Sequence, residues 1–208
     1  MSIKDRKSRE HTLLRQKILA AALRIFAEQG YGKVSMRKIG ALIDYSPTTI
    51  YRFFRNKAEL LRTIAAETYG DLSKKFEKIK TEGGDDPLGV LKSLVKEYII
   101  FCVERPEMFR LFSDLGTFEM EDGIMYERLG ETRYRVYQSW FRFIRQSIES
   151  GYLELKDDMR VFLYLWDSIN GYISQRIAHP RVPRKPLEDD SSEYLSLVFR
   201  GIETVKNS

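Results

Sequence analysis

Apolar residues recur every three to four positions along most of the chain, and this spacing constrains the fold more than any other feature. The pattern is clear between residues 12 and 29, at Leu14, Ile18, Ala22 and Ile25. Such positions lie on one face of an α-helix, which has about 3.6 residues per turn. No stretch keeps the strict alternation of apolar and polar residues typical of a half-buried strand. The sequence therefore predicts an all-α fold.

Residues that start or stop helices indicate where each helix lies. Gly30 is suited to end the first helix, Ser35 and Asn56 are good N-caps, and Pro47 fits the first turn of a helix. A stretch rich in glycine and acidic residues, 81–87, is the clearest linker. The expected helices span about 12–29, 35–43, 47–54, 56–79, 87–104, 107–115, 121–129, 131–149, 157–178 and 191–206.

The positive charge is concentrated at one end of the chain. The 208 residues carry 35 Lys and Arg against 30 Asp and Glu, a net charge of +5. Residues 1–60 hold 13 basic and 5 acidic residues, a net charge of +8, so the remainder carries −3. Phosphates attract such a surplus, which releases counterions from nucleic acid, but a merely solvated basic surface has the same composition. Charge alone leaves both interpretations open.

Two short helices joined by a tight turn, preceded by a longer amphipathic helix, indicate a helix-turn-helix unit. In such a unit the second short helix enters the major groove, and helix ends hold phosphate oxygens. Threonine hydroxyls can bond bases or phosphates, and Arg37 is the best candidate for a guanine contact. The predicted DNA-contacting residues are Ser35, Arg37, Ser46, Pro47, Thr48, Thr49, Tyr51, Arg52 and Lys57.

These residues resemble the N-terminal signature of the tetracycline-repressor-like (TetR) family of bacterial regulators. The resemblance covers roughly residues 12–62, at Ile18 to Phe26, Gly30-Tyr31, Val34 to Gly40 and Ser46 to Leu61. Three residues depart from the family pattern: Met36 replaces a frequent threonine, Gly40 a usual alanine, and Asp44 the glycine that usually begins the turn. Asp tolerates unusual backbone angles better than most residues.

The resemblance implies an N-terminal three-helix DNA-binding domain followed by a larger helical bundle for effector binding and dimerisation. We therefore expect a DNA-binding domain over 1–56 (ordered from about residue 12), a connecting helix over 57–80 and an effector-binding and dimerisation domain over 81–208. Double-stranded DNA with a palindromic operator, a second copy of the chain and a small-molecule effector are the partners that the resemblance implies.

The last two expected helices are apolar on more than one face, which is typical of helices buried on two sides. They lie either inside the monomer or between its core and a twofold partner, and the second arrangement matches a palindromic DNA site. The residues predicted for a dimer interface are Val161, Leu165, Ser168, Tyr172, Tyr194, Val198, Gly201, Ile202 and Val205.

The middle of the chain is rich in aromatic residues and methionine, which line ligand pockets in helical domains but also form ordinary cores. The residues predicted for ligand binding are Phe101, Met108, Phe109, Phe112, Phe118, Met125, Tyr134, Tyr137, Phe141 and Trp166. The sequence alone leaves pocket and packed core as alternatives. Cys102 fits a small buried apolar residue, with redox sensing as the alternative.

Other classes of protein are disfavoured. The single cysteine and the two histidines, His11 and His179, offer no disulfide, no metal-ligand spacing and no nucleophile–base pair. Apolar runs stay far below the ~18 residues of a membrane helix, and no signal sequence is visible. We expect a cytoplasmic, homodimeric transcriptional regulator without cofactor, metal or catalytic activity, most simply a repressor that a small apolar or amphipathic ligand releases from DNA. The alternative is a helix-turn-helix protein without a small-molecule effector, either architectural or controlled by a protein partner.

Overall fold

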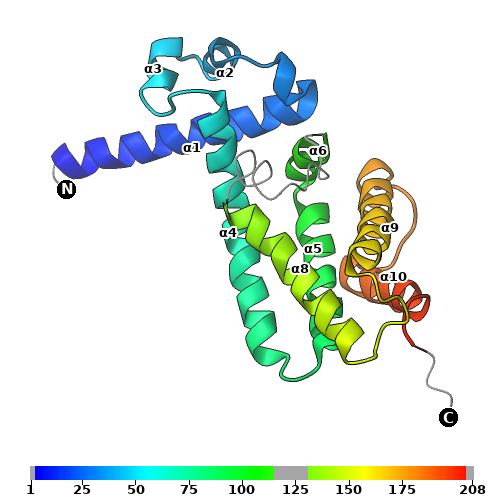
Figure 1. Cartoon of the computed structure of the whole chain (residues 1–208). Helices are drawn as coiled ribbons and strands as arrows, with labels where there is room; N and C mark the ends of the chain where they lie inside the picture. Colours follow the sequence, from blue (N-terminus) through cyan, green and yellow to red (C-terminus); the bar gives the residue numbers. More distant parts are fainter. Residues whose placement is uncertain (1–2, 115–130, 205–208) are drawn as a thin grey trace. The chain divides into compact units, whose positions relative to one another are not determined.

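The structure, a computed structural model, describes residues 3–114 and 131–204, which form helices joined by short connections (Figure 1). Within these residues the only β-type pairing is an isolated antiparallel bridge between Leu153 and Glu203. The all-α prediction is confirmed. The helices are α1 (Ile3–Gln29), the 3₁₀ turn η1 (Tyr31–Lys33), α2 (Met36–Leu42), α3 (Pro47–Tyr51), α4 (Lys57–Glu82), α5 (Pro87–Glu104), α6 (Pro106–Asp114), α8 (Glu131–Glu149), α9 (Asp158–Ala178) and α10 (Leu187–Arg200).

The chain divides into two compact units. The first comprises Met1–Thr68 and Glu107–Glu131, and the second comprises Tyr69–Pro106 and Thr132–Ser208. The division falls inside α4, so this helix contributes to both units. The boundaries expected from the sequence, after residues 56 and 80, separate a DNA-binding domain, a connecting helix and an effector-binding domain. This division by function stays a prediction.

The first unit has a core made by one face each of its helices. The predicted stripe of α1 is buried from Ile18 to Phe26 while Leu14 is half-buried, and Ile39 of α2, Ile50 of α3 and Leu60 of α4 are each 0% exposed. Helix α2 packs against both α1 and α3. Burial of these aliphatic and aromatic side chains is the main driving force that holds α2 on α1 and α3 on α2.

The second unit is built around α5, which packs against α9 and α10. Rings from three helices meet beside it. The indole of Trp140 on α8 lies 5.2 Å from the Tyr98 ring on α5 and 6.0 and 6.1 Å from the Trp166 and Phe162 rings on α9, measured between centroids. We call Tyr98, Tyr137, Trp140, Phe162 and Trp166 the aromatic cluster.

Local signals set most helix boundaries as expected. Asp86 and Asp157 cap α5 and α9 by accepting hydrogen bonds from the backbone N–H of Gly89 and Arg160. Gly30 follows α1 with a φ of 80°, a left-handed conformation that favours glycine.

Two boundaries differ at the N-terminal end of the chain. Helix α1 begins at Ile3 rather than near residue 12. The sequence did not reveal this start, because the first turns of the helix are exposed and polar and so carry no apolar periodicity. Helix α3 ends at Tyr51 rather than Phe54, and the backbone after it tightens: the N–H of Arg52 is shared by the carbonyls of Thr48 and Thr49, and that of Phe53 bonds the carbonyl of Ile50.

The last helix, α10, spans 187–200 rather than 191–206. It begins after Pro186 and carries acidic residues in its first turn, where they complement the helix dipole. It ends at Gly201 because the following segment pairs with the turn after α8: the N–H of Glu154 bonds the carbonyl of Ile202, and that of Thr204 bonds the carbonyl of Tyr152. The expected helix at 121–129 lies outside the described residues.

Candidate nucleic-acid interface

The turn between α2 and α3 depends on the two residues that depart from the family pattern there. Asp44 adopts a φ of 63°, a left-handed conformation that Asp tolerates better than most residues. The N–H of Tyr45 bonds the carbonyl of Gly40 at 2.9 Å. A Cβ on residue 40 would lie 2.6 Å from the carbonyl oxygen of Tyr45, so the tight return of the chain requires glycine.

Serine hydroxyls cap both short helices. Ser35 Oγ accepts the N–H of Lys38 at 3.3 Å, and Ser46 Oγ accepts the N–H of Thr49 at 3.2 Å. Ser46 Oγ also lies 3.0 Å from Thr49 Oγ1. These predicted DNA-contacting residues therefore also satisfy backbone groups that helix ends leave open.

Helix α3 buries one face and exposes the other. Ile50 is 0% exposed, and Phe54, which follows the helix, is 2% exposed. On the opposite face Thr48, Tyr51 and Arg52 are exposed, with Tyr51 at 54%. Pro47 and Thr49 are half-buried. The structure thus brings the predicted residues of α3 together on one solvent-facing surface.

Two arginines of this surface are available to an anion. Arg37 on α2 and Arg52 at the end of α3 are both exposed. Their guanidinium groups make no ion pair or hydrogen bond with any residue that the structure describes. An unpaired guanidinium can bind a phosphate or a guanine edge with two parallel hydrogen bonds.

Lys57 has a structural role that the sequence did not reveal. Its Nζ donates to the carbonyl oxygens of Tyr31 at 2.6 Å and Val34 at 3.0 Å, and lies 4.1 Å from the centre of the Tyr31 ring. Burial raises the pKa of the Tyr31 phenol, against a smaller opposite effect of Arg62. Lys57 therefore links the start of α4 to the segment before Ser35, which leaves one ammonium hydrogen for a phosphate.

Contacts over long sequence distances brace α1 against the end of the helix-turn-helix. The guanidinium of Arg15 binds the Glu67 carboxylate at 2.5 Å and lies 5.7 Å from the centre of the Phe54 ring. The His11 ring stacks on Phe53 with centroids 4.4 Å apart. Sequence reasoning missed these pairs because no local pattern connects residues so far apart in the chain.

Three of the residues predicted for ligand binding meet in the second unit. Tyr137 and Trp166 contact at 5.1 Å between ring centroids, and Phe141 stacks on Phe162 at 4.4 Å. Phe101 lies apart from them, 5.6 Å from the Tyr69 ring. Among the predicted residues, Phe101, Met108, Phe109, Phe112, Tyr137 and Trp166 are buried, Tyr134 and Phe141 are half-buried, and Phe118 and Met125 lie outside the described residues.

One polar atom of the aromatic cluster has no visible partner. Trp140 is 0% exposed, and its Nε1 makes no hydrogen bond to any residue that the structure describes. A buried N–H without an acceptor costs about 1–3 kcal/mol, so such a group calls for an explanation.

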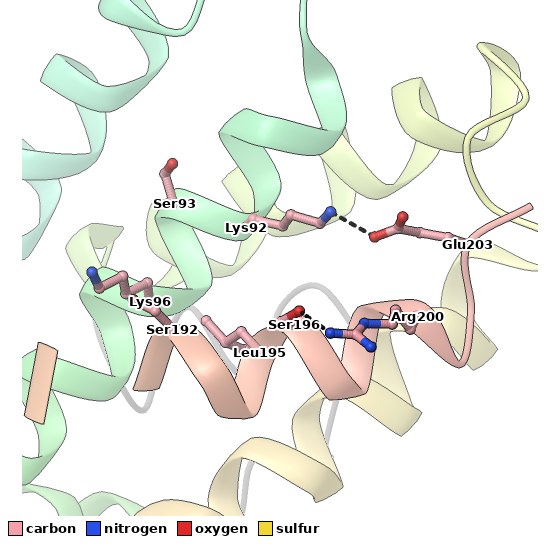
Figure 2. Close-up of a pocket in the computed structure, with 8 residues that line it drawn as sticks. All are labelled: Lys92, Ser93, Lys96, Ser192, Leu195, Ser196, Arg200 and Glu203. Carbon is pink, nitrogen blue, oxygen red and sulfur yellow. Dashed lines mark hydrogen bonds and ion pairs between the residues drawn. The ribbon is translucent and has the colours of Figure 1, made fainter. Parts of the chain in front are cut away.

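A surface groove between α5 and α10 has a different character (Figure 2). Its lysines are paired: Lys92 Nζ lies 2.6 Å from a Glu203 carboxylate oxygen and Lys96 Nζ lies 3.0 Å from one of Glu188, whereas Arg200 donates to the neutral Ser196 Oγ at 3.1 Å. The groove is lined by Lys92, Ser93, Lys96, Ser192, Leu195, Ser196, Arg200 and Glu203. None of the residues predicted for ligand binding lines it.

The residues predicted for a dimer interface divide into three groups. Val161 and Leu165 are 0% and 1% exposed and pack inside their own chain. Tyr172 stacks on Tyr194 with centroids 4.3 Å apart, and the Tyr194 hydroxyl lies 2.5 Å from Ser168 Oγ. Val198 and Ile202 are half-buried, Gly201 is exposed after α10, and Val205 lies outside the described residues.

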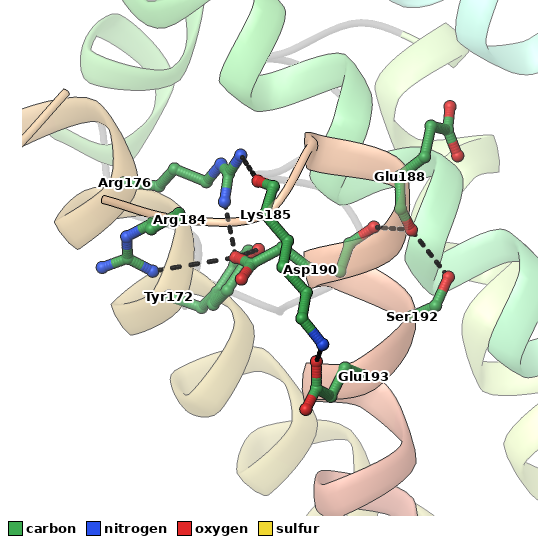
Figure 3. Close-up of polar contacts among 9 residues, drawn as sticks. Tyr172, Arg176, Arg184, Lys185, Glu188, Asp190, Ser192 and Glu193 are labelled. Atoms are coloured by element: carbon green, nitrogen blue, oxygen red, sulfur yellow. Dashed lines mark hydrogen bonds and ion pairs between the residues drawn. The ribbon is translucent and has the colours of Figure 1, made fainter. Parts of the chain in front are cut away.

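Figure 3 shows the polar cluster that joins the end of α9 to the start of α10. The carboxylate of Asp190 accepts hydrogen bonds from the Tyr172 hydroxyl and the Arg176 guanidinium, each at 2.5 Å, and Arg184 lies 3.8 Å away. Burial first, and then the hydrogen bond to Asp190, raise the pKa of Tyr172 to about 12. Sequence reasoning did not single out Asp190 or Arg176, because an acidic residue in the first turn of a helix is explained by the helix dipole alone.

Two other kinds of site are absent from the residues that the structure describes. In the ranges 3–114 and 131–204, no group of histidine, cysteine, aspartate and glutamate side chains could hold a metal ion. No helix in these ranges is long and apolar enough to cross a membrane.

Comparison with known proteins finds similarity in the N-terminal part of the chain. Residues 18–64 match the family of bacterial regulatory proteins called the tetR family. The DNA-binding transcriptional repressor TetR of Mycobacteroides abscessus is 42% identical over 66 residues, 32% of this chain and 34% of that protein. The HTH-type transcriptional repressor KstR of Rhodococcus jostii is 34% identical over 73 residues, 35% of this chain and 31% of that protein. The chain thus matches only about a third of the length of these curated relatives.

The fold extends the likeness to the rest of the chain. The ketosteroid transcriptional regulator KstR2 of Mycobacterium tuberculosis superposes with a TM-score of 0.72 at 20% sequence identity, over 91% of this chain and 95% of that one. The proteins named in these comparisons are regulators rather than enzymes. The matched segment, residues 18–64, contains the turn, the caps and the exposed α3 surface described above, so this N-terminal part of the chain is similar to bacterial regulatory proteins of the tetR family.

Proposed function

We propose that this protein is a cytoplasmic, homodimeric transcriptional repressor that binds a palindromic operator and is released by a small apolar or amphipathic ligand. The observation that carries the proposal is the exposed surface of α2 and α3. Its backbone is held by caps and a tight turn, while Arg37 and Arg52 have no partner in the described chain. A rigid surface with unpaired guanidinium groups is suited to bind duplex DNA.

The face that meets DNA follows from the burial of α3. Ile50 anchors the helix in the core, so Thr48, Tyr51 and Arg52 face outward, where they could enter a major groove. The net charge of +8 over residues 1–60 favours approach to a phosphate backbone.

Homodimerisation is supported by apolar side chains that the single chain leaves in water. Leu197 on α10 is 63% exposed and Tyr164 on α9 is 50% exposed. Large exposed apolar side chains on helices that carry the predicted interface residues fit a twofold contact between copies. A twofold dimer would present two α3 helices to half-sites ~34–36 Å apart.

Ligand control is supported by the aromatic cluster. The buried Nε1 of Trp140 offers a hydrogen-bond donor among apolar rings, which fits a ligand with an apolar body and an acceptor oxygen. The solved relative KstR2 is described as a ketosteroid regulator, a ligand class of this kind. A ligand would release DNA only by binding the non-DNA-binding conformation more tightly.

Selection of bound duplexes from a random pool tests the DNA part of the proposal. We expect a consensus with twofold symmetry and two half-sites about one helical turn apart. A protein that stays monomeric and enriches no duplex at low ionic strength would overturn the proposal. A symmetric consensus whose binding responds to no ligand would instead favour the helix-turn-helix regulator without a small-molecule effector.

Tryptophan fluorescence tests the ligand part, because the only two tryptophans of the chain, Trp140 and Trp166, both lie in the aromatic cluster. Progesterone and palmitate are suitable probes of the ketone and carboxylate classes. A ligand that accepts from Trp140 should shift the emission and weaken DNA binding. In Trp140→Phe, which keeps an aromatic ring but loses the N–H, its affinity should fall about 5- to 10-fold, the cost of roughly one hydrogen bond.

A further inference from the structure

The first three turns of α1 extend beyond what the core of the first unit requires. Every residue from 4 to 13 is exposed, and the buried stripe of α1 begins only at Ile18. We call residues 4–13 the N-terminal arm. Figure 1 shows α1 continuing past α3 towards the N-terminus of the chain. A helical segment whose side chains are all exposed gains little from packing, and a short polar helix is marginal in water on its own.

The arm is basic and lies next to the end of α3. It carries four basic residues against two acidic ones. The exposed ion pair of Arg6 with Glu10 has side chains that are 76% and 62% exposed, so it contributes little to stability. Lys7 and Arg9 form no ion pair with any residue in the described ranges. The arm is therefore an exposed cationic surface.

Helical periodicity gives the arm two distinct basic faces. Lys4, Lys7 and His11 follow the spacing i, i+3, i+7 and share one face. The His11 ring stacks on Phe53, two residues beyond the end of α3, which orients this face towards the α3 side.

The two arginines of the arm lie on the opposite face of the helix. Arg6 and Arg9 share the opposite face with Leu13, which is 58% exposed. Each face thus carries two basic residues, and Arg6 of the second face is paired with Glu10.

We propose that Lys4 and Lys7 bind phosphates of the duplex just outside the half-site that α3 contacts. The inference rests on the DNA binding proposed above and adds a second contact region to it. At a rise of 1.5 Å per residue, Lys7 and Lys4 lie about 6 and 10 Å along the helix axis from His11. The His11–Phe53 stack turns the face of the arm that carries both lysines towards the segment that follows α3.

The test compares two charge-matched double variants, Lys4→Ala/Lys7→Ala and Arg6→Ala/Arg9→Ala. Each removes two positive charges, and alanine favours the helix, so both should fold with unchanged helical circular dichroism. Two duplexes containing the selected site are used: one ends at the outer edge of the half-sites, and the other continues for one helical turn on each side. Binding is measured over a range of salt concentrations.

On the longer duplex, the lysine variant should lower the slope of log K against log salt by about 0.9 for each phosphate that it no longer neutralises. The same variant should match the wild type on the shorter duplex. The arginine variant should stay close to the wild type on both, and hydroxyl-radical protection outside the half-sites should disappear only with the lysine variant.

Equal losses of affinity for the two variants would show a general charge effect and overturn the inference, as would unchanged slopes for the lysine variant on the longer duplex. These outcomes leave the proposed DNA binding intact. A wild-type protein that binds neither duplex would overturn the proposed function together with this inference.

Discussion

Within each of the two units, a different kind of contact stands out. In the first unit, side chains close in sequence satisfy backbone groups: Ser35 and Ser46 cap α2 and α3, and Gly40 closes the turn between them. In the second unit, rings of α5, α8 and α9 pack together, and Asp190 of α10 binds Arg176 of α9.

The two units also contain basic side chains that differ in whether they have an acidic partner. Arg37 and Arg52 face water without a partner in the described chain, whereas Lys92, Lys96 and Arg176 each pair with an acidic group. The exposed surface of α2 and α3 keeps its two arginines available to an anionic partner, whereas cations that hold helices together, including Arg15 of the first unit, are paired with carboxylates. Four substitutions, taken in decreasing order of effect, test this contrast.

The largest effect is expected from adding one methyl group to the turn of the first unit. In Gly40→Ala the new Cβ would lie 2.6 Å from the Tyr45 carbonyl, so we expect a loss of about 3 kcal/mol and weaker DNA binding. Gly70→Ala is the matched change in the α4 segment of the second unit, where a Cβ meets nothing within 4 Å. It should stabilise the protein by about 0.5–1 kcal/mol, because glycine is a poor helix former. Urea unfolding measures the change in stability of both variants, and amide exchange of α2 shows whether Gly40→Ala loosens the turn. Equal changes in stability for the two variants would contradict the contrast between the two glycine positions.

Lys57→Ala should destabilise the first unit rather than only weaken DNA binding. The variant leaves the carbonyls of Tyr31 and Val34 without their charged donor, which costs about 2 kcal/mol. Lys33→Ala is the control, because Lys33 is exposed and its replacement removes the same charge nearby. Thermal unfolding should separate them, with a lower midpoint only for Lys57→Ala. A stable Lys57→Ala protein would show that the contact with the 31–34 segment is dispensable.

Arg37→Ala should change sequence preference without changing stability. If Arg37 contacts a guanine, its loss costs about 1–3 kcal/mol on the selected operator and relaxes the preference at one base pair. Competition between the operator and single-base variants measures this. Equal weakening on the operator and on random DNA would place Arg37 on a phosphate instead.

The smallest effect is expected at the junction of α9 and α10. Tyr172→Phe removes the hydroxyl that donates to Asp190 and should cost about 1 kcal/mol near neutral pH. Because the folded-state pKa of Tyr172 is raised from 10.0 to about 12, the neutral phenol stabilises the fold below pH 10 and this contribution is lost as the pH rises towards 12. Thermal scans across this range should show a smaller alkaline loss of stability in Tyr172→Phe than in the wild type.

Much of the fold follows from neighbouring residues. The caps Asp86 and Asp157 and the stop at Gly30 act over three or four positions, so their effect is visible in the sequence. The start of α1 was missed for the opposite reason: an exposed polar helix has no apolar stripe to reveal it. The same exposure makes its basic residues a candidate DNA contact.

In the candidate site, too, some features follow from neighbouring residues and others do not. The outward position of Thr48, Tyr51 and Arg52 follows from the helical period once Ile50 is placed in the core. The commitment of Lys57 to the carbonyls of the 31–34 segment does not, because these groups are more than 20 residues away in the chain.

The sequence by itself determined that this chain is helical, where most helices begin and end, and that a helix-turn-helix resembling that of the TetR family lies near its N-terminus. Periodicity, caps and turns act between near neighbours, so each leaves a local signature. Only the tertiary structure decided which polar groups are used up inside the chain, as in Arg15 with Glu67 and Tyr172 with Asp190, 52 and 18 residues apart. Such pairs form when packing brings distant segments together, and the availability of each side chain for DNA, ligand or a second copy depends on that packing.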